Sequence, residues 1–97
     1  MILVRDVFQA KYGKGGDLVV LMKEARETWL AKYATGHILT DVSGQFFTVV
    51  TETEVESLAD WEKRAGEVFA LPEFGDWFSR MTTLVESGRR EFYNIEV

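Results

Sequence analysis

The sequence predicts a single α+β domain over residues 1–97, with elements in the order strand, helix, strand, strand, helix, strand. Three observations support this order. Segments rich in β-branched and aromatic residues alternate with period two, apolar stripes of period 3.6 lie between them, and glycines or polar turns mark the junctions. The order is that of the split βαβ, or ferredoxin-like, fold. Right-handed crossovers then give a four-stranded antiparallel sheet with the helices on one face.

The first strand and the first helix are expected in the N-terminal third of the chain. Residues 2–12 predict a strand that carries apolar side chains on both alternating faces. The glycine-rich stretch 13–16 ends this strand, and Asp17 is expected to cap the following helix. An apolar stripe over residues 18–34 indicates that helix, with Gly36 as the left-handed residue that closes it.

Three more strands complete the predicted sheet. Residues 38–42 and 45–55 are expected to pair through a tight hairpin, because a short polar link containing glycine joins them. Residues 89–97 are expected to form the last strand, and the Arg89–Arg90 doublet is interpreted as its solvated start. Neither face of the first and third strands is cleanly polar. The sheet face without helices therefore needs a partner, and a second copy in a homodimer is the simplest one.

The second helical segment, residues 57–88, holds two of the three tryptophans and the only proline. Its apolar residues keep helical spacing on both sides of a break near Pro72. Ser57 is expected to cap the first half, Pro72 to begin the second half, and Gly88 to end it. This amount of aromatic surface must either close a core or line a pocket.

Composition excludes several classes of function. The net charge of −5 argues against nucleic-acid binding, which needs a basic surface. The absence of cysteine excludes disulfides and thiolate metal sites, and it gives no sign of an oxidising compartment. No apolar run approaches the length of a membrane span, so a cytoplasmic location is expected.

His37 is the only histidine and the only side chain with an ordinary pKa near neutrality. It follows the first helix directly, so it is either a polar residue at a junction or a candidate general base. No second ligand stands at a metal-binding spacing, and no metal site is expected.

Three segments carry a resemblance to a known family. They are VRDVFQAKYGKGGDL (residues 4–18), ESLADWE (56–62) and ALPEFGDWF (70–78). The first resembles a family opening in which a strand with arginine turns into helix one, and the others resemble the start and the break of the second helix. Over nearly its whole length the chain resembles the dimeric α+β barrel superfamily. Within it, the chain is most similar to NIPSNAP-type and related small uncharacterised proteins.

The resemblance implies a ligand pocket between the sheet and the helices of each subunit. The superfamily includes cofactor-free and haem-degrading monooxygenases, lactone isomerases, haem-dependent chlorite dismutases and many proteins without known activity. Haem-degrading members hold the iron with a histidine on the second helical segment. Residues 57–88 contain no histidine, so haem is not expected, although Tyr93 or another tyrosine could ligate it in principle. No other cofactor is expected.

Two functions remain open at this point. The first is a binding protein for a small apolar or aromatic ligand, with aromatic pocket walls from Trp29, Trp61, Trp77, Phe78 and Tyr93. The alternative is a cofactor-independent, monooxygenase-like or isomerase-like enzyme acting on an aromatic or polyketide-like substrate. There His37 would be the base and Arg5 would stabilise developing negative charge, with Asp6 and Asp41 in reserve. The scarcity of titratable candidates favours the binding protein.

Overall fold

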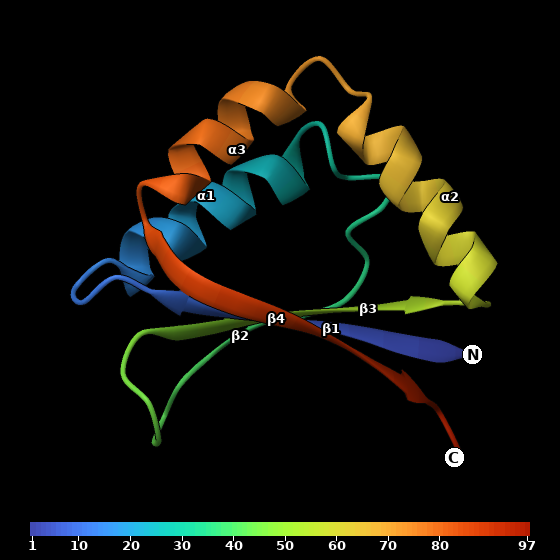
Figure 1. Ribbon diagram of the computed structural model, residues 1–97, viewed down its shortest axis with the longest axis horizontal. Helices are drawn as coiled ribbons and strands as arrows, with labels where there is room; N and C mark the ends of the chain where they lie inside the picture. Colours follow the sequence, from blue (N-terminus) through green and yellow to red (C-terminus); the bar gives the residue numbers. More distant parts are fainter.

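The computed structural model describes residues 1–97 and consists of a four-stranded antiparallel sheet with three helices on one face (Figure 1). The elements are β1 (Ile2–Ala10), α1 (Gly15–Glu27), β2 (Ile38–Thr40), β3 (Thr48–Val55), α2 (Leu58–Phe69), α3 (Phe74–Thr82) and β4 (Val85–Asn94). The strand order across the sheet is β2-β3-β1-β4. The predicted ferredoxin-like order is therefore confirmed, with the second helix divided in two. No helix has both the length and the apolar composition that a membrane crossing requires.

The hydrophobic core lies under α1. Its central cluster is Ala10, Leu18, Met22 and Val49, which come from β1, α1 and β3. In contrast, neither α2 nor α3 contains a fully buried residue, although both have a strongly amphipathic sequence. In the whole chain only 11 of 97 residues are buried. The apolar faces of α2 and α3 therefore do not close a core in the single chain.

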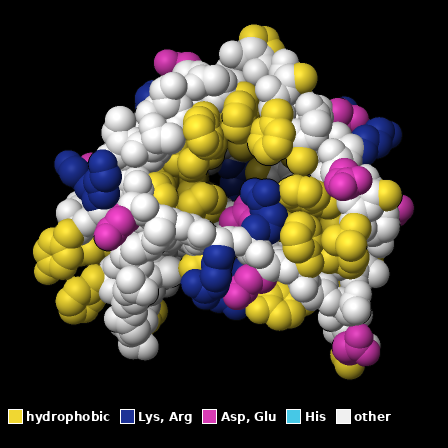
Figure 2. Space-filling view, viewed as in Figure 1, with side chains coloured by type: hydrophobic (Ala, Val, Ile, Leu, Met, Phe, Trp, Pro, Cys, Tyr) yellow, Lys and Arg dark blue, Asp and Glu magenta, His cyan; other side chains and the backbone are white.

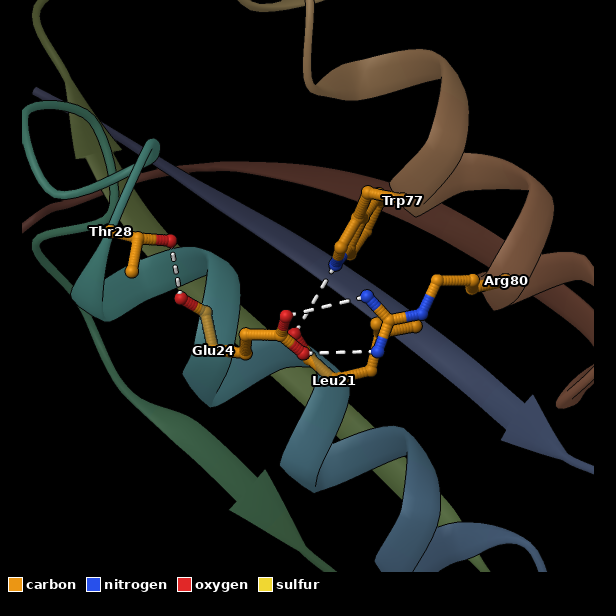
Figure 3. A network of polar contacts seen from close by, with 5 residues as sticks. All are labelled: Leu21, Glu24, Thr28, Trp77 and Arg80. Carbon is orange, nitrogen blue, oxygen red and sulfur yellow. Dashed lines mark hydrogen bonds and ion pairs between the residues drawn. The ribbon is translucent and has the colours of Figure 1, made fainter.

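Helix α3 is held in place by α1 (Figure 3). The indole Nε1 of Trp77 donates a hydrogen bond of 3.2 Å to the carbonyl oxygen of Leu21. One turn further along α3, the guanidinium of Arg80 donates to both carboxylate oxygens of Glu24, at 3.3 and 3.0 Å. These contacts join the two helices side by side, whereas α2 stands apart and leans over the far end of the sheet (Figure 1).

The ends of α1 differ from the prediction. The helix starts at Gly15, so Asp17 lies within its first turn, 3.8 Å from Lys14 Nζ, and does not cap it. The helix ends at Glu27 because the Thr28 hydroxyl donates to the Glu24 carbonyl oxygen and the backbone turns. Residues 28–34, expected to be helical, instead form a series of turns.

Gly36 does not have the left-handed conformation expected of a helix-closing residue. It is needed for a different reason. A Cβ atom at this position would collide with the backbone carbonyl of Glu52 in β3. The neighbouring backbone is tied to the same residue, because Glu52 N donates to the His37 carbonyl oxygen at 2.9 Å. The chain after α1 can therefore lie against β3 only with glycine here.

The link between β2 and β3 is a loop over residues 41–47, so the tight hairpin predicted there is wrong. Polar side chains compete with the sheet ladder for backbone groups. The carboxylate of Asp41 accepts from Thr48 N at 3.0 Å, and Gln9 Nε2 donates to the Phe46 carbonyl oxygen at 2.6 Å. Gly44 and Phe47 take positive φ angles of 90° and 58° to complete the loop.

The segment 57–88 is only partly as predicted. The Ser57 cap is confirmed, since its hydroxyl accepts from Asp60 N at 3.1 Å. Pro72 lies in the turn before α3, which begins at Phe74. Gly88 does not end a helix, because β4 already begins at Val85. A Cβ on Gly88 would lie only 3.1 Å from the Val7 carbonyl oxygen, so this glycine lets β4 approach β1 closely.

We expect Gly36→Ala to lower the free energy of unfolding by about 2–3 kcal/mol, because the new methyl group would displace the backbone of β3. Urea denaturation measures the change. Gly66→Ala is the matched control. Gly66 lies inside α2 with open space around its Cβ position, so this change should stabilise the protein by about 0.5–1 kcal/mol. Equal stability of Gly36→Ala and the wild type would contradict the close contact.

Candidate ligand-binding site

An open cavity of about 360 Å³ lies between the three helices and the sheet face that they cover, which we call the helix face. Figure 2 shows this hollow ringed by hydrophobic side chains, with basic and acidic side chains at its mouth. Seventeen of its 26 lining residues are hydrophobic. Helices α2 and α3 form an arch over the sheet (Figure 1). Neither helix has a fully buried residue, and the space beneath the arch remains open as the cavity.

Aromatic side chains build the roof and one wall of the cavity. Trp29 and Trp77 meet edge to face with ring centroids 5.8 Å apart, and Phe74 stacks on Phe78 at 5.5 Å. Trp61 of α2 contacts Phe92 of β4 at 5.2 Å. The rings therefore pack directly against one another, and all except Phe92 also line the cavity. Such a lining suits flat apolar ligands.

A polar row crosses the floor of the cavity. The sheet register places Thr51, Asp6 and Arg90 side by side on β3, β1 and β4. The Arg90 guanidinium donates to both carboxylate oxygens of Asp6, at 2.6 and 3.1 Å. It also lies 4.8 Å from the ring centroid of Trp61, in a cation–π arrangement. This ion pair and its aromatic cover form one fixed polar patch in an otherwise apolar cavity.

Three further polar side chains on the cavity wall have no side-chain hydrogen bond or ion pair of their own. The hydroxyl of Thr53 is buried and has no hydrogen-bond partner. Arg26, half-buried in the last turn of α1, takes part in none of the five ion pairs. His37 lines the cavity but is exposed, and only its backbone is hydrogen-bonded. These groups are available to a bound molecule.

The turns at residues 28–34 connect the cavity wall to α2. The Tyr33 hydroxyl donates to the Glu67 carboxylate at 2.9 Å. This hydrogen bond, together with the nearby negative charge, raises the pKa of Tyr33 above its ordinary value, so the phenol stays protonated at neutral pH. Because the predicted helix ends early, Trp29, Leu30 and Tyr33 all lie on the wall of the cavity.

The structure brings together most, but not all, of the residues expected at a site. Six of them line the cavity: Asp6, His37, Trp29, Trp61, Trp77 and Phe78. Arg5 instead lines a second hollow of about 550 Å³ on the opposite face of the sheet, the far face, and Asp41 lies there as well. Tyr93, paired with Leu3 and about half exposed, also belongs to the far face. His37 and Arg5 therefore do not share a cavity.

Strand alternation explains this separation. Successive side chains on a strand point to opposite faces, so Arg5 points away when Asp6 points into the cavity. The same rule turns Arg90 inward and Arg89 outward. Arg89 is solvated as expected, with 66% of its side chain exposed, but Arg90 lines the cavity, and both residues lie inside β4 and not at its start. Arg26 and Thr53 had not been singled out, and Arg90 had not been expected at the cavity. Because alternate residues of a strand share a face, the sequence already placed Asp6 between the apolar residues Val4 and Phe8. This spacing was the one sign that Asp6 and its partner lie in the cavity.

The sequence matches no protein-family model and no curated protein. The fold, however, matches solved structures. An uncharacterized NIPSNAP domain protein from Burkholderia xenovorans superposes with a TM-score of 0.89 and 16% identity, over 98% of this chain and 94% of that one. A NIPSNAP family protein from Agrobacterium tumefaciens gives a TM-score of 0.86 and 18% identity, over 96% and 90%. This chain therefore shares the ferredoxin-like α+β fold of these two proteins.

A broader similarity accompanies this one. A monooxygenase-like protein of antibiotic biosynthesis from Nitrosomonas europaea superposes with a TM-score of 0.73 and 12% identity, over 100% of both chains. The resemblance to NIPSNAP-type and related α+β proteins is thereby confirmed at the level of the fold.

We expect the Asp6–Arg90 pair to contribute about 1 kcal/mol to stability, at the upper end for partly exposed pairs, since the side chains are 21% and 41% exposed. A double-mutant cycle with Asp6→Asn and Arg90→Gln measures this coupling in urea. The exposed Lys14–Asp17 pair, tested with Lys14→Gln and Asp17→Asn, is the control and should show almost none. A coupling near zero for Asp6–Arg90 would show that the floor of the cavity is not organised by this pair.

Proposed function

We propose that this protein binds a small, flat, apolar or aromatic ligand in the cavity between its sheet and helices. The observation that carries the proposal is the aromatic surface of α2 and α3, which lines a cavity and buries none of its residues fully. Leaving such surface exposed to water is unfavourable by about 25 cal/mol per Å². A ligand that covers it gains this free energy on binding.

The dimensions of the cavity support a ligand of modest size. Its volume of about 360 Å³ falls at the small end of the usual range for small-molecule sites. Trp77 is fixed from behind by its hydrogen bond to Leu21, so this wall is pre-formed. A rigid wall limits the conformational entropy lost on binding. A molecule of roughly two fused rings fits these constraints.

A cofactor-independent monooxygenase-like or isomerase-like enzyme is the second candidate. Two observations favour it: His37 borders the cavity, and the monooxygenase-like protein from Nitrosomonas europaea has a similar fold. In such an enzyme His37 would take a proton from the substrate as general base. Arg90 or Arg26, which line the cavity, would replace Arg5 in stabilising the resulting anion. The sparse set of titratable groups still favours binding without catalysis.

We expect naphthols, naphthoquinones and related two-ring compounds to raise the melting temperature, since a ligand that binds only the native state stabilises it. Ala65→Trp should abolish binding, because Ala65 lines the cavity and the indole would fill it. Glu62→Trp, an exposed change on the same helix, is the matched control and should bind normally in calorimetry. If no compound binds, or if Ala65→Trp binds as well as the control, the proposal is wrong. Oxygen uptake or isomerisation that His37→Gln abolishes would establish the second candidate.

We also propose that the far face of the sheet is covered by a second copy of the chain. Leu3 and Leu39 leave apolar surface accessible on this face, beside the buried Val7 and Val50. The Nε of Arg5 is buried there without a hydrogen-bond partner, which a second chain could supply. The single chain also buries few residues, and a second copy would increase the apolar surface removed from water. A cytoplasmic location, expected from the acidic, cysteine-free sequence, is likewise a proposal.

Light scattering at micromolar concentration should give twice the mass of one chain. Leu39→Glu, placed on the far face where Leu39 is 38% exposed, should shift the protein to monomers by burying a charge in the interface. Val20→Glu is the control, because Val20 is 65% exposed on α1 and lies away from this face. A monomeric wild type would rule out the homodimer.

A further inference from the structure

We infer that the ligand of the cavity is an amphipathic anion: an apolar ring system with one oxyanion, of which a carboxylate is the simplest, read by Arg26 and Thr53. This inference rests on the proposed ligand-binding function and adds the charge of the ligand to it. Two independent observations carry it. They are the distribution of charge around the cavity and the buried hydroxyl of Thr53 that has no partner.

Charge is distributed unevenly over the molecule. The chain has 16 acidic and 11 basic residues, yet the cavity is lined by three arginines and only two acidic residues, Asp6 and Glu52. Glu52 precedes Thr53 on β3, so strand alternation directs its side chain to the far face. An acidic protein has therefore placed an excess of positive charge in its main apolar cavity. Low-dielectric walls strengthen the attraction of such charge for an anion.

Only one of the three arginines is free. Arg90 is bound at two points by Asp6, and Arg64 pairs with Asp60 at 3.3 Å. Arg26 has no ion pair, although it is half-buried beside aromatic residues of the cavity wall. Arg26 lies in the last turn of α1, where the helix dipole stabilises a positive charge. This stabilisation amounts to only about 0.3–1 kcal/mol and does not replace an ion pair. A guanidinium keeps its charge at every physiological pH and can bind a carboxylate at two points.

Thr53 supplies a second polar group. Its hydroxyl is buried and unpaired, which is unfavourable unless a ligand completes the hydrogen bond. A hydroxyl can donate to an oxyanion. A cationic ligand would find little in this cavity, because the one carboxylate that points into it, that of Asp6, is already bound to Arg90. The cavity therefore selects against cations and provides free donors for an anion.

The test compares 2-naphthoic acid with 2-naphthamide, which has the same shape and no charge, by isothermal titration calorimetry. The wild type should bind the acid about tenfold more tightly than the amide, and high salt should reduce this ratio. In Arg26→Gln the ratio should fall to about one while the amide still binds, which also shows that the variant is folded. Lys23→Gln, an exposed change on the same helix outside the cavity, should keep the wild-type ratio.

Thr53→Val tests the second group. The near-isosteric change removes the unpaired hydroxyl, so the free protein should be no less stable while the affinity for the acid falls about threefold. Equal binding of the acid and the amide by the wild type would overturn the inference and leave the proposed function intact. A wild-type ratio retained in Arg26→Gln would overturn the assignment of Arg26. If neither compound binds, the proposed function fails and the inference fails with it.

Discussion

The attachment of α3 to α1 determines the shape of this molecule. Trp77 is anchored to the backbone of Leu21, and Arg80 is bound by Glu24, so α3 rests on another helix as well as on the edge of the core. With α3 held there, the chain must cross from the end of β3 to α3 through α2. The resulting arch cannot lie flat on the sheet. Its apolar faces are left lining a cavity, although their sequence has the pattern of a core.

The sheet separates two chemical environments by strand alternation alone. On β1, Val4, Asp6 and Phe8 face the cavity, while Arg5, Val7 and Gln9 face the opposite hollow. The helix face is thus apolar with a neutralised ion pair and a free arginine. The far face mixes apolar residues with a buried, unpaired guanidinium nitrogen. A ligand on one face and a second chain on the other would complete two surfaces that the single chain leaves unfinished.

The predictions from sequence succeeded where local pattern and tertiary structure agree. The order of elements, the Ser57 cap and the break in the second helical segment follow from periodicity and capping chemistry, which act over a few residues. Four of the five aromatic residues expected at a pocket do line the cavity. The errors arose where distant residues intervene. Gly36 and Gly88 are required by backbone on other strands, and the hydrogen bond from Thr48 to Asp41 closes a longer loop in place of the expected tight hairpin.

The sequence by itself therefore determined the βαββαβ order, the amphipathic faces of the helices and the absence of a cysteine or polyhistidine site. These properties depend on residue type and on short-range spacing. Only the tertiary structure decided that the aromatic faces of α2 and α3 line a cavity. It also decided that Asp6 pairs with Arg90 and that Arg5 lies outside this cavity. Those outcomes depend on strand register and on the position of α3 against α1. Both are set by contacts between residues far apart in the chain.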